Sequence, residues 1–225
     1  MQLLDQQLAK IREQLLMMAS LVDRNLNAAM RSLVERDDKL AELVEAEDSQ
    51  IDQMEIAIDE MVVKFMATHG PIAQDCRLML VSSKISNNLE RIADQAVAIS
   101  RRARELNTQP MLKPLIDIPR MAQVAQEMLR DSLTALADKK PELTLEIKSR
   151  DKSVDEINKQ IARELTSFML EDPATITRAL NLMLVARCIE RIADHAKNIA
   201  EEVYFLYRAQ DIRHGNGVGE AVAVE

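Results

Sequence analysis

The sequence contains few of the residues that interrupt helices or build sheets. Among its 225 residues there are only 4 glycines, 6 prolines and no tryptophan, and aromatic residues make up 2%. Strands usually carry runs of Val, Thr and Tyr separated by glycine-rich turns, so this composition argues against a sheet protein. Hydrophobic residues still make up 47% of the chain, which is enough to bury a substantial core. We therefore expect an all-α protein.

The sequence also lacks the marks of several functional classes. Its net charge of −8 argues against a nucleic-acid partner, because binding to a phosphate backbone depends mainly on Lys and Arg. No apolar run approaches the ~20 residues that span a bilayer, and the first residues do not form a secretory signal. Cys76 and Cys188 stand singly in apolar segments, where we expect buried small hydrophobic residues. These features predict a soluble, cytoplasmic protein that does not insert into a membrane.

One five-residue segment occurs twice. Glu190-Arg191-Ile192-Ala193-Asp194 repeats residues 90–94, and the two copies are 100 residues apart. This period is too long for a small solenoid repeat and fits a duplicated unit of three helices. Three prolines between residues 107 and 119 resist a continuous helix and mark the boundary between the units. We predict two tandem, similar three-helix bundles at 1–106 and 118–207, joined by a linker at 107–117 and followed by a flexible tail at 208–225.

Apolar residues recur at steps of three and four, a period typical of amphipathic helices. The pattern predicts helices at about 3–34, 37–68, 71–106, 118–137, 141–170 and 172–207. Asp37 is the expected N-cap of the second helix, and Asp172 followed by Pro173 is the expected start of the last. Gly70 and Pro71 should end the second helix.

The repeated segment carries two acids four residues apart. If Ile189 and Ile192 face the core, a heptad places Glu190, Asp194 and Asn198 on the far side of the last helix. Like charges at this spacing destabilise a helix by roughly 0.2 to 0.5 kcal/mol, and a bound cation would remove that cost.

A second acidic pair repeats one helix earlier in each unit. These pairs are Asp48 and Asp52 in the first unit and Asp151 and Asp155 in the second. Antiparallel packing would bring each pair beside a Glu-x-x-x-Asp segment, and four carboxylates, with Asn198 and His195 in the second unit, would suit a hard or borderline cation. In the alternative interpretation the acids form a solvated surface and pair with Arg91 and Arg191, and such exposed pairs contribute about 0 to 1 kcal/mol.

The residues together resemble the PhoU family of accessory regulators of bacterial phosphate uptake. The resemblance covers nearly the whole chain and rests on the doubled Glu-Arg-Ile-Ala-Asp segment, on Met-Glu-Ile-Ala-Ile-Asp-Glu at 54–60 and on Gln-Asp-Ile-Arg-His at 210–214. It implies two three-helix bundles that carry metal ions or clusters, with iron or zinc expected before magnesium or manganese. Carried over by position, the implied ligands are Asp48, Asp52, Glu90 and Asp94 in the first unit, and Asp151, Asp155, Glu190, Asp194 and the neighbouring Asn198 in the second.

The chain departs from the family pattern at several positions. The family usually has glycine where this chain has Ala93 and Ala193. The first unit also has Gln95 and Ala98 at the positions that His195 and Asn198 occupy in the second. This difference predicts that the first site binds metal more weakly.

The resemblance implies a role in phosphate homeostasis. Such proteins link the ATP-binding subunit of the phosphate ABC transporter to a sensor histidine kinase and act as negative regulators of the phosphate-starvation response. We expect a homodimeric, non-enzymatic adaptor without catalytic residues, since the sequence shows no phosphate-binding loop, nucleophile elbow or reactive Cys/His pair. The alternatives are a carboxylate-bridged di-metal enzyme, against which the absence of Glu-x-x-His argues, and a purely structural helical scaffold.

Overall fold

The computed structural model describes residues 2–213, and within them all regular structure is helical. The long helices are α1 (Gln2–Val34), α2 (Asp38–His69), α3 (Ala73–Asn107), α4 (Asp117–Asp138), α5 (Ile147–Glu171) and α6 (Ile176–Arg208). Two short 3-10 helices, η1 (Pro141–Thr144) and η2 (Pro173–Thr175), precede α5 and α6. The predicted all-α class and the six helices are confirmed, while the predicted tail beyond residue 213 lies outside the described residues.

The predicted boundary residues act as expected at the start and end of α2. The Asp37 side chain accepts a hydrogen bond from the Lys39 backbone nitrogen at 2.9 Å. Gly70 follows the helix with a φ of 53°, a left-handed conformation that costs glycine little. Helix α3 begins at Ala73 rather than at Pro71, because the residue before it, Ile72, is extended.

The predicted starts of the last two helices were wrong by several residues. Pro141 opens a 3-10 turn, and α5 begins only at Ile147. Asp172 does cap a turn, since its side chain accepts a hydrogen bond from the Ala174 nitrogen at 3.0 Å, but that turn is η2 and α6 follows it. Proline suits the first turn of a 3-10 or an α-helix equally, so the sequence signal did not separate the two.

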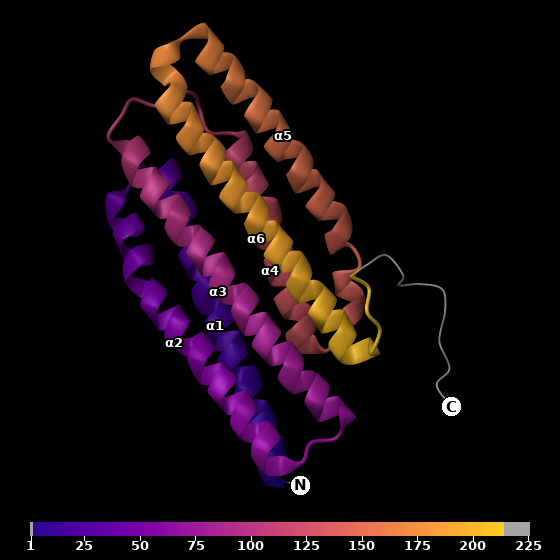
Figure 1. The fold of residues 1–225 in the computed structure, drawn as a ribbon. Helices are drawn as coiled ribbons and strands as arrows, with labels where there is room; N and C mark the ends of the chain where they lie inside the picture. The colour runs from indigo at the N-terminus through magenta and orange to yellow at the C-terminus, as the bar shows by residue number, and fades with distance from the viewer. Residues whose placement is uncertain (1, 214–225) are drawn as a thin grey trace.

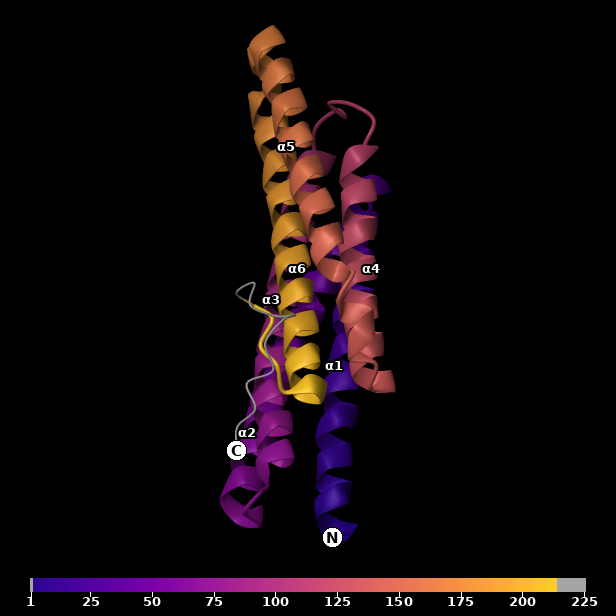
Figure 2. The same ribbon diagram turned by 90° about the vertical axis from the view of Figure 1, so that its right-hand side faces the viewer.

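Each repeat is a bundle of three long helices, and the two bundles lie side by side (Figure 1). Helices α1, α2 and α3 pack together in the first repeat, and α4, α5 and α6 pack together in the second. The repeats meet through α3 against α6 and through α1 against α4, and both views show an elongated molecule (Figure 2). Helices α2 and α5 therefore lie outside a central layer of four helices.

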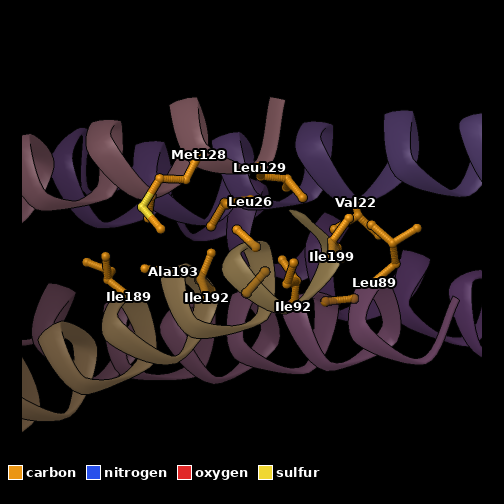
Figure 3. Close-up of a cluster of buried hydrophobic side chains, with 14 of the residues drawn as sticks. Val22, Leu26, Leu89, Ile92, Met128, Leu129, Ile189, Ile192, Ala193 and Ile199 are labelled. Atoms are coloured by element: carbon orange, nitrogen blue, oxygen red, sulfur yellow. The ribbon is translucent and has the colours of Figure 1, made fainter. Parts of the chain in front are cut away.

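The two repeats share one hydrophobic core. Buried side chains from α1, α3, α4 and α6 point toward one another between the helices, among them Leu26, Ile92, Met128 and Ile192 (Figure 3). Ala93 and Ala193 are also buried, and such small side chains suit close packing of long helices. The expectation of two similar three-helix repeats is confirmed, but the repeats do not have separate cores. No helix in residues 2–213 combines the length and apolar character needed to cross a membrane.

Candidate functional site

In the first repeat, the four predicted acids lie between the outer helix α2 and α3. Burial raises the pKa of Asp48, and the negative charges of Asp52 and Asp94 raise it further. Burial also raises the pKa of Glu90 to about 7, with Asp94 as the next cause and Asp52 among the others. The structure thus brings the carboxylates of the two helices within electrostatic range of one another. We call Asp48, Asp52, Glu90 and Asp94 the first acidic cluster.

The acids are less exposed than the heptad assignment suggested. The side chains of Glu90 and Glu190 are only 16% and 17% exposed, whereas that of Asp194 is 54% exposed. The prediction that these acids all face solvent was wrong for the two glutamates. Glu90 lies within electrostatic range of Asp52 and Glu55 of the outer helix α2, and a heptad drawn for one helix does not show such a neighbour.

Arg91 contacts two acids of the first acidic cluster. Its Nε lies 3.3 Å from Glu90 Oε2, and its Nη1 lies 3.3 Å from Asp94 Oδ2. The contact with Glu90 lacks hydrogen-bond geometry, so the buried Oε2 atom accepts no hydrogen bond. A buried carboxylate oxygen without a donor is costly, and it leaves one strong acceptor available to a cation.

Three of the four corresponding acids of the second repeat carry basic partners from the same chain. These acids are Asp151, Asp155, Glu190 and Asp194, which we call the second acidic cluster. Lys197 Nζ donates to Asp151 Oδ2 at 2.6 Å and to Asp194 Oδ1 at 3.4 Å. Arg187, which lies one turn before Glu190 on α6, forms an ion pair with it. The Asp151 side chain is only 13% exposed, so its bond to the ammonium group is largely shielded from water.

His195 and Asn198 were expected to join the second acidic cluster, and the structure places their polar atoms elsewhere. His195 Nδ1 donates to Asn88 Oδ1 at 2.9 Å, and Asn198 Nδ2 approaches the same oxygen at 3.4 Å. Both contacts cross from α6 to α3 of the other repeat. Burial lowers the pKa of His195, which favours the neutral imidazole. These two side chains connect the repeats.

A polar cavity of about 510 Å³ lies beside this connection, between α2, α3 and α6. Glu202, which the sequence analysis did not single out, lines it with only 8% of its side chain exposed. Lys84 of the other repeat donates to Glu202 Oε1 at 2.9 Å. The sequence did contain a signal for this residue. Glu202 follows the core residue Ile199 by three positions, and residues three apart on a helix are neighbours, so Glu202 lies beside the apolar stripe.

Most of the chain matches one family of proteins. The family profile described as the PhoU domain matches residues 15–103 and again residues 118–203. The chain is 39% identical over 209 residues to a phosphate-specific transport system accessory protein PhoU homolog of Pseudomonas aeruginosa, covering 92% of this chain and 86% of the relative. It is 36% identical over 211 residues to the PhoU accessory protein of Escherichia coli, covering 94% of this chain and 88% of the relative.

Solved structures agree with the sequence comparisons. The crystal structure of PhoU from Pseudomonas aeruginosa superposes with a TM-score of 0.89 at 38% identity, covering 92% of this chain and 99% of that chain. The PhoU regulatory protein of Streptococcus pneumoniae, at 22% identity, shares the fold with a TM-score of 0.85, covering 93% of this chain and 99% of that chain. The architecture defines a duplicated three-helix bundle with paired acidic motifs. The chain belongs to the PhoU family.

The donor groups decide how well each acidic cluster suits the metal that the resemblance implies. Within residues 2–213, no group of three His, Cys, Asp or Glu side chains lies close enough together to surround a metal ion. The first acidic cluster nevertheless supplies carboxylate oxygens, one of them buried without a donor, and such ligands suit Mg²⁺ or Mn²⁺ with water completing the coordination. The second cluster does not fit, because Lys197 and Arg187 already neutralise Asp151, Asp194 and Glu190.

Proposed function

We propose that this protein is a non-enzymatic accessory regulator of a phosphate transport system and a negative regulator of the phosphate-starvation response. The observation that carries the proposal is the match of both repeats, over 92% or more of the chain, to proteins named as phosphate-specific transport system accessory proteins. A partial match to one repeat would support the fold alone. The match across both repeats supports a shared role.

The proposed mechanism is that of a cytoplasmic adaptor that transmits a state by surface contact. Its partners would be the ATP-binding subunit of the phosphate ABC transporter and the sensor histidine kinase of the phosphate regulon. The continuous core supports this role, because helices that share buried side chains move together and keep their outer faces in fixed positions. Arg91 and Arg191 are exposed on α3 and α6, where charges can steer partner choice without changing the fold. A homodimer is part of the proposal.

We also propose that the first acidic cluster binds a divalent cation. A cation there would interact with Glu90 and Asp94 of α3 and with Asp48 and Asp52 of α2. It would offset both the burial of charge and the repulsion between acids, which together raise the pKa values of Asp48 and Glu90. It would thereby hold α2 against α3. Carboxylate donors without imidazole or thiolate favour Mg²⁺ or Mn²⁺ over the iron or zinc that the family resemblance implied.

Affinity capture from phosphate-replete cells tests the adaptor role. The tagged protein, expressed at its natural level, should retain the ATP-binding subunit of the phosphate transporter, identified by mass spectrometry. Arg191→Glu is the matched variant, since this exposed side chain can be reversed in charge without disturbing the core. Capture of no transporter component by the wild-type protein, at normal expression of the transporter, would contradict the proposal.

A further inference from the structure

The 100-residue repeat allows the two acidic clusters to be compared position by position. The segments 90–94 and 190–194 are identical, so both clusters have the same glutamate, arginine and aspartate on the inner helix. The flanking positions differ in charge. Asn87 of α3 corresponds to Arg187 of α6, and Val97 corresponds to Lys197. At these two positions the second repeat therefore carries positive charges that the first repeat lacks, one on either side of the repeated segment.

Both added charges contact the acids of the second cluster. Lys197 reaches across from α6 to Asp151 of α5 at 2.6 Å and also lies 3.4 Å from Asp194. Its ammonium group thus joins carboxylates from the two helices that a bound cation would have to connect. In the first repeat Asn87 donates to Glu55 at 2.9 Å, and Val97 is buried, so neither residue supplies charge to the first cluster.

We propose that Lys197 is the built-in cation of the second acidic cluster, so that the chain binds divalent metal through its first repeat alone. This inference rests on the proposed metal binding by the first acidic cluster. Arg91 and Arg191 occupy equivalent positions, and Arg91 contacts Glu90 and Asp94 of its own helix. What distinguishes Lys197 is that its ammonium group links the inner helix to an acid of the outer helix. The comparison of the two repeats in sequence predicted stronger metal binding at the second site because of His195 and Asn198. In the structure these side chains contact Asn88 of the other repeat instead.

The physical reason is competition for the same oxygens. A lysine ammonium group carries three donors and one positive charge, and here it is tethered to the helix that also bears Asp194. A divalent ion would have to displace this ammonium from a carboxylate that is only 13% exposed, and would also meet its repulsion. The substitution Lys197→Val removes the competitor and introduces the residue found at the equivalent position of the first repeat.

Exchange of the two residues tests the inference. Wild type, Lys197→Val and Val97→Lys would be stripped of metal by chelation and titrated with Mn²⁺ by isothermal calorimetry, with bound manganese also counted by elemental analysis. We expect one Mn²⁺ per chain for wild type, two for Lys197→Val and none for Val97→Lys. Lys152→Val is the matched control, because Lys152 is exposed next to Asp151 on α5, and it should bind one.

A second variant separates misfolding from lost binding, since Val97 is buried. Glu90→Gln combined with Asp94→Asn should bind none in the first repeat, and adding Lys197→Val to it should restore one Mn²⁺ per chain. If Lys197→Val gains no manganese while remaining folded by circular dichroism, the inference about Lys197 is overturned, whatever wild type binds. Two Mn²⁺ in wild type would also overturn it and leave the proposed metal binding intact. No manganese in wild type with one in Lys197→Val would overturn metal binding by the first repeat, and it would support the role of Lys197 as the cation of the second cluster.

Discussion

Glu90→Gln should stabilise the metal-free protein at alkaline pH. In the folded state the pKa of Glu90 is raised from 4.5 to about 7, first by burial and then by the charge of Asp94. A raised carboxyl pKa means that the folded state holds a proton more tightly than the unfolded state does. Wild-type stability therefore falls as the pH rises from 4.5 through 7, and the full cost, about 3 kcal/mol at most, is reached above pH 7.

Glutamine keeps the shape of the side chain and removes the charge. Its buried amide lacks some hydrogen-bond partners, so we expect a net stabilisation of about 1 to 2 kcal/mol at pH 8. At pH 5 the effect should be about 2 kcal/mol smaller, so that the substitution is neutral or slightly destabilising there. Urea denaturation with a chelator present measures the free energy of unfolding at both pH values. The matched control is Glu190→Gln, which removes a pair with Arg187 and should be neutral or destabilising by about 0 to 1 kcal/mol. Equal effects of Glu90→Gln at pH 5 and pH 8 would refute the reasoning.

Two further predictions concern the shared core and the outer surface. Ile192→Ala, at a fully buried position between the repeats, should lower the free energy of unfolding by about 2 to 5 kcal/mol in a single urea transition, whereas Leu170→Ala, at an 82% exposed position, should change it by less than about 0.5 kcal/mol. Two separate transitions would show that the repeats unfold independently. Arg191→Glu should partly derepress a phosphate-regulated reporter while circular dichroism and the unfolding midpoint stay near wild type. Full repression by a normally expressed variant would argue against a role for this face.

The sequence predicted the helices well because their signals are local. The apolar steps of three and four placed each helix, and Asp37 and Gly70 bounded α2 as expected. The start of α5 was missed because Pro141 favours the first turn of either helix type. The repeated segment identified the duplication directly. It did not reveal that the repeats share a core, since contacts between α3 and α6 depend on tertiary packing.

The candidate site was predicted only in part. The acids of α2 and α3 were correctly expected to lie near one another, because antiparallel neighbours bring residues 48 and 52 beside residues 90 and 94. The burial of Glu90 and Glu190 was missed, since a helical wheel does not include the outer helix. Lys197 was also missed as a competing cation. Its position three residues after Asp194 was visible in the sequence, but its bond to Asp151 required the placement of α5 on α6.

A reporter measurement tests the central claim of a phosphate regulator most directly. The gene for this chain would be deleted, and expression from a phosphate-regulated promoter would be followed in rich and in limiting phosphate. The account predicts high expression in rich phosphate after deletion and restored repression when the wild-type chain is supplied again. Normal repression in the deletion strain at high phosphate would contradict it.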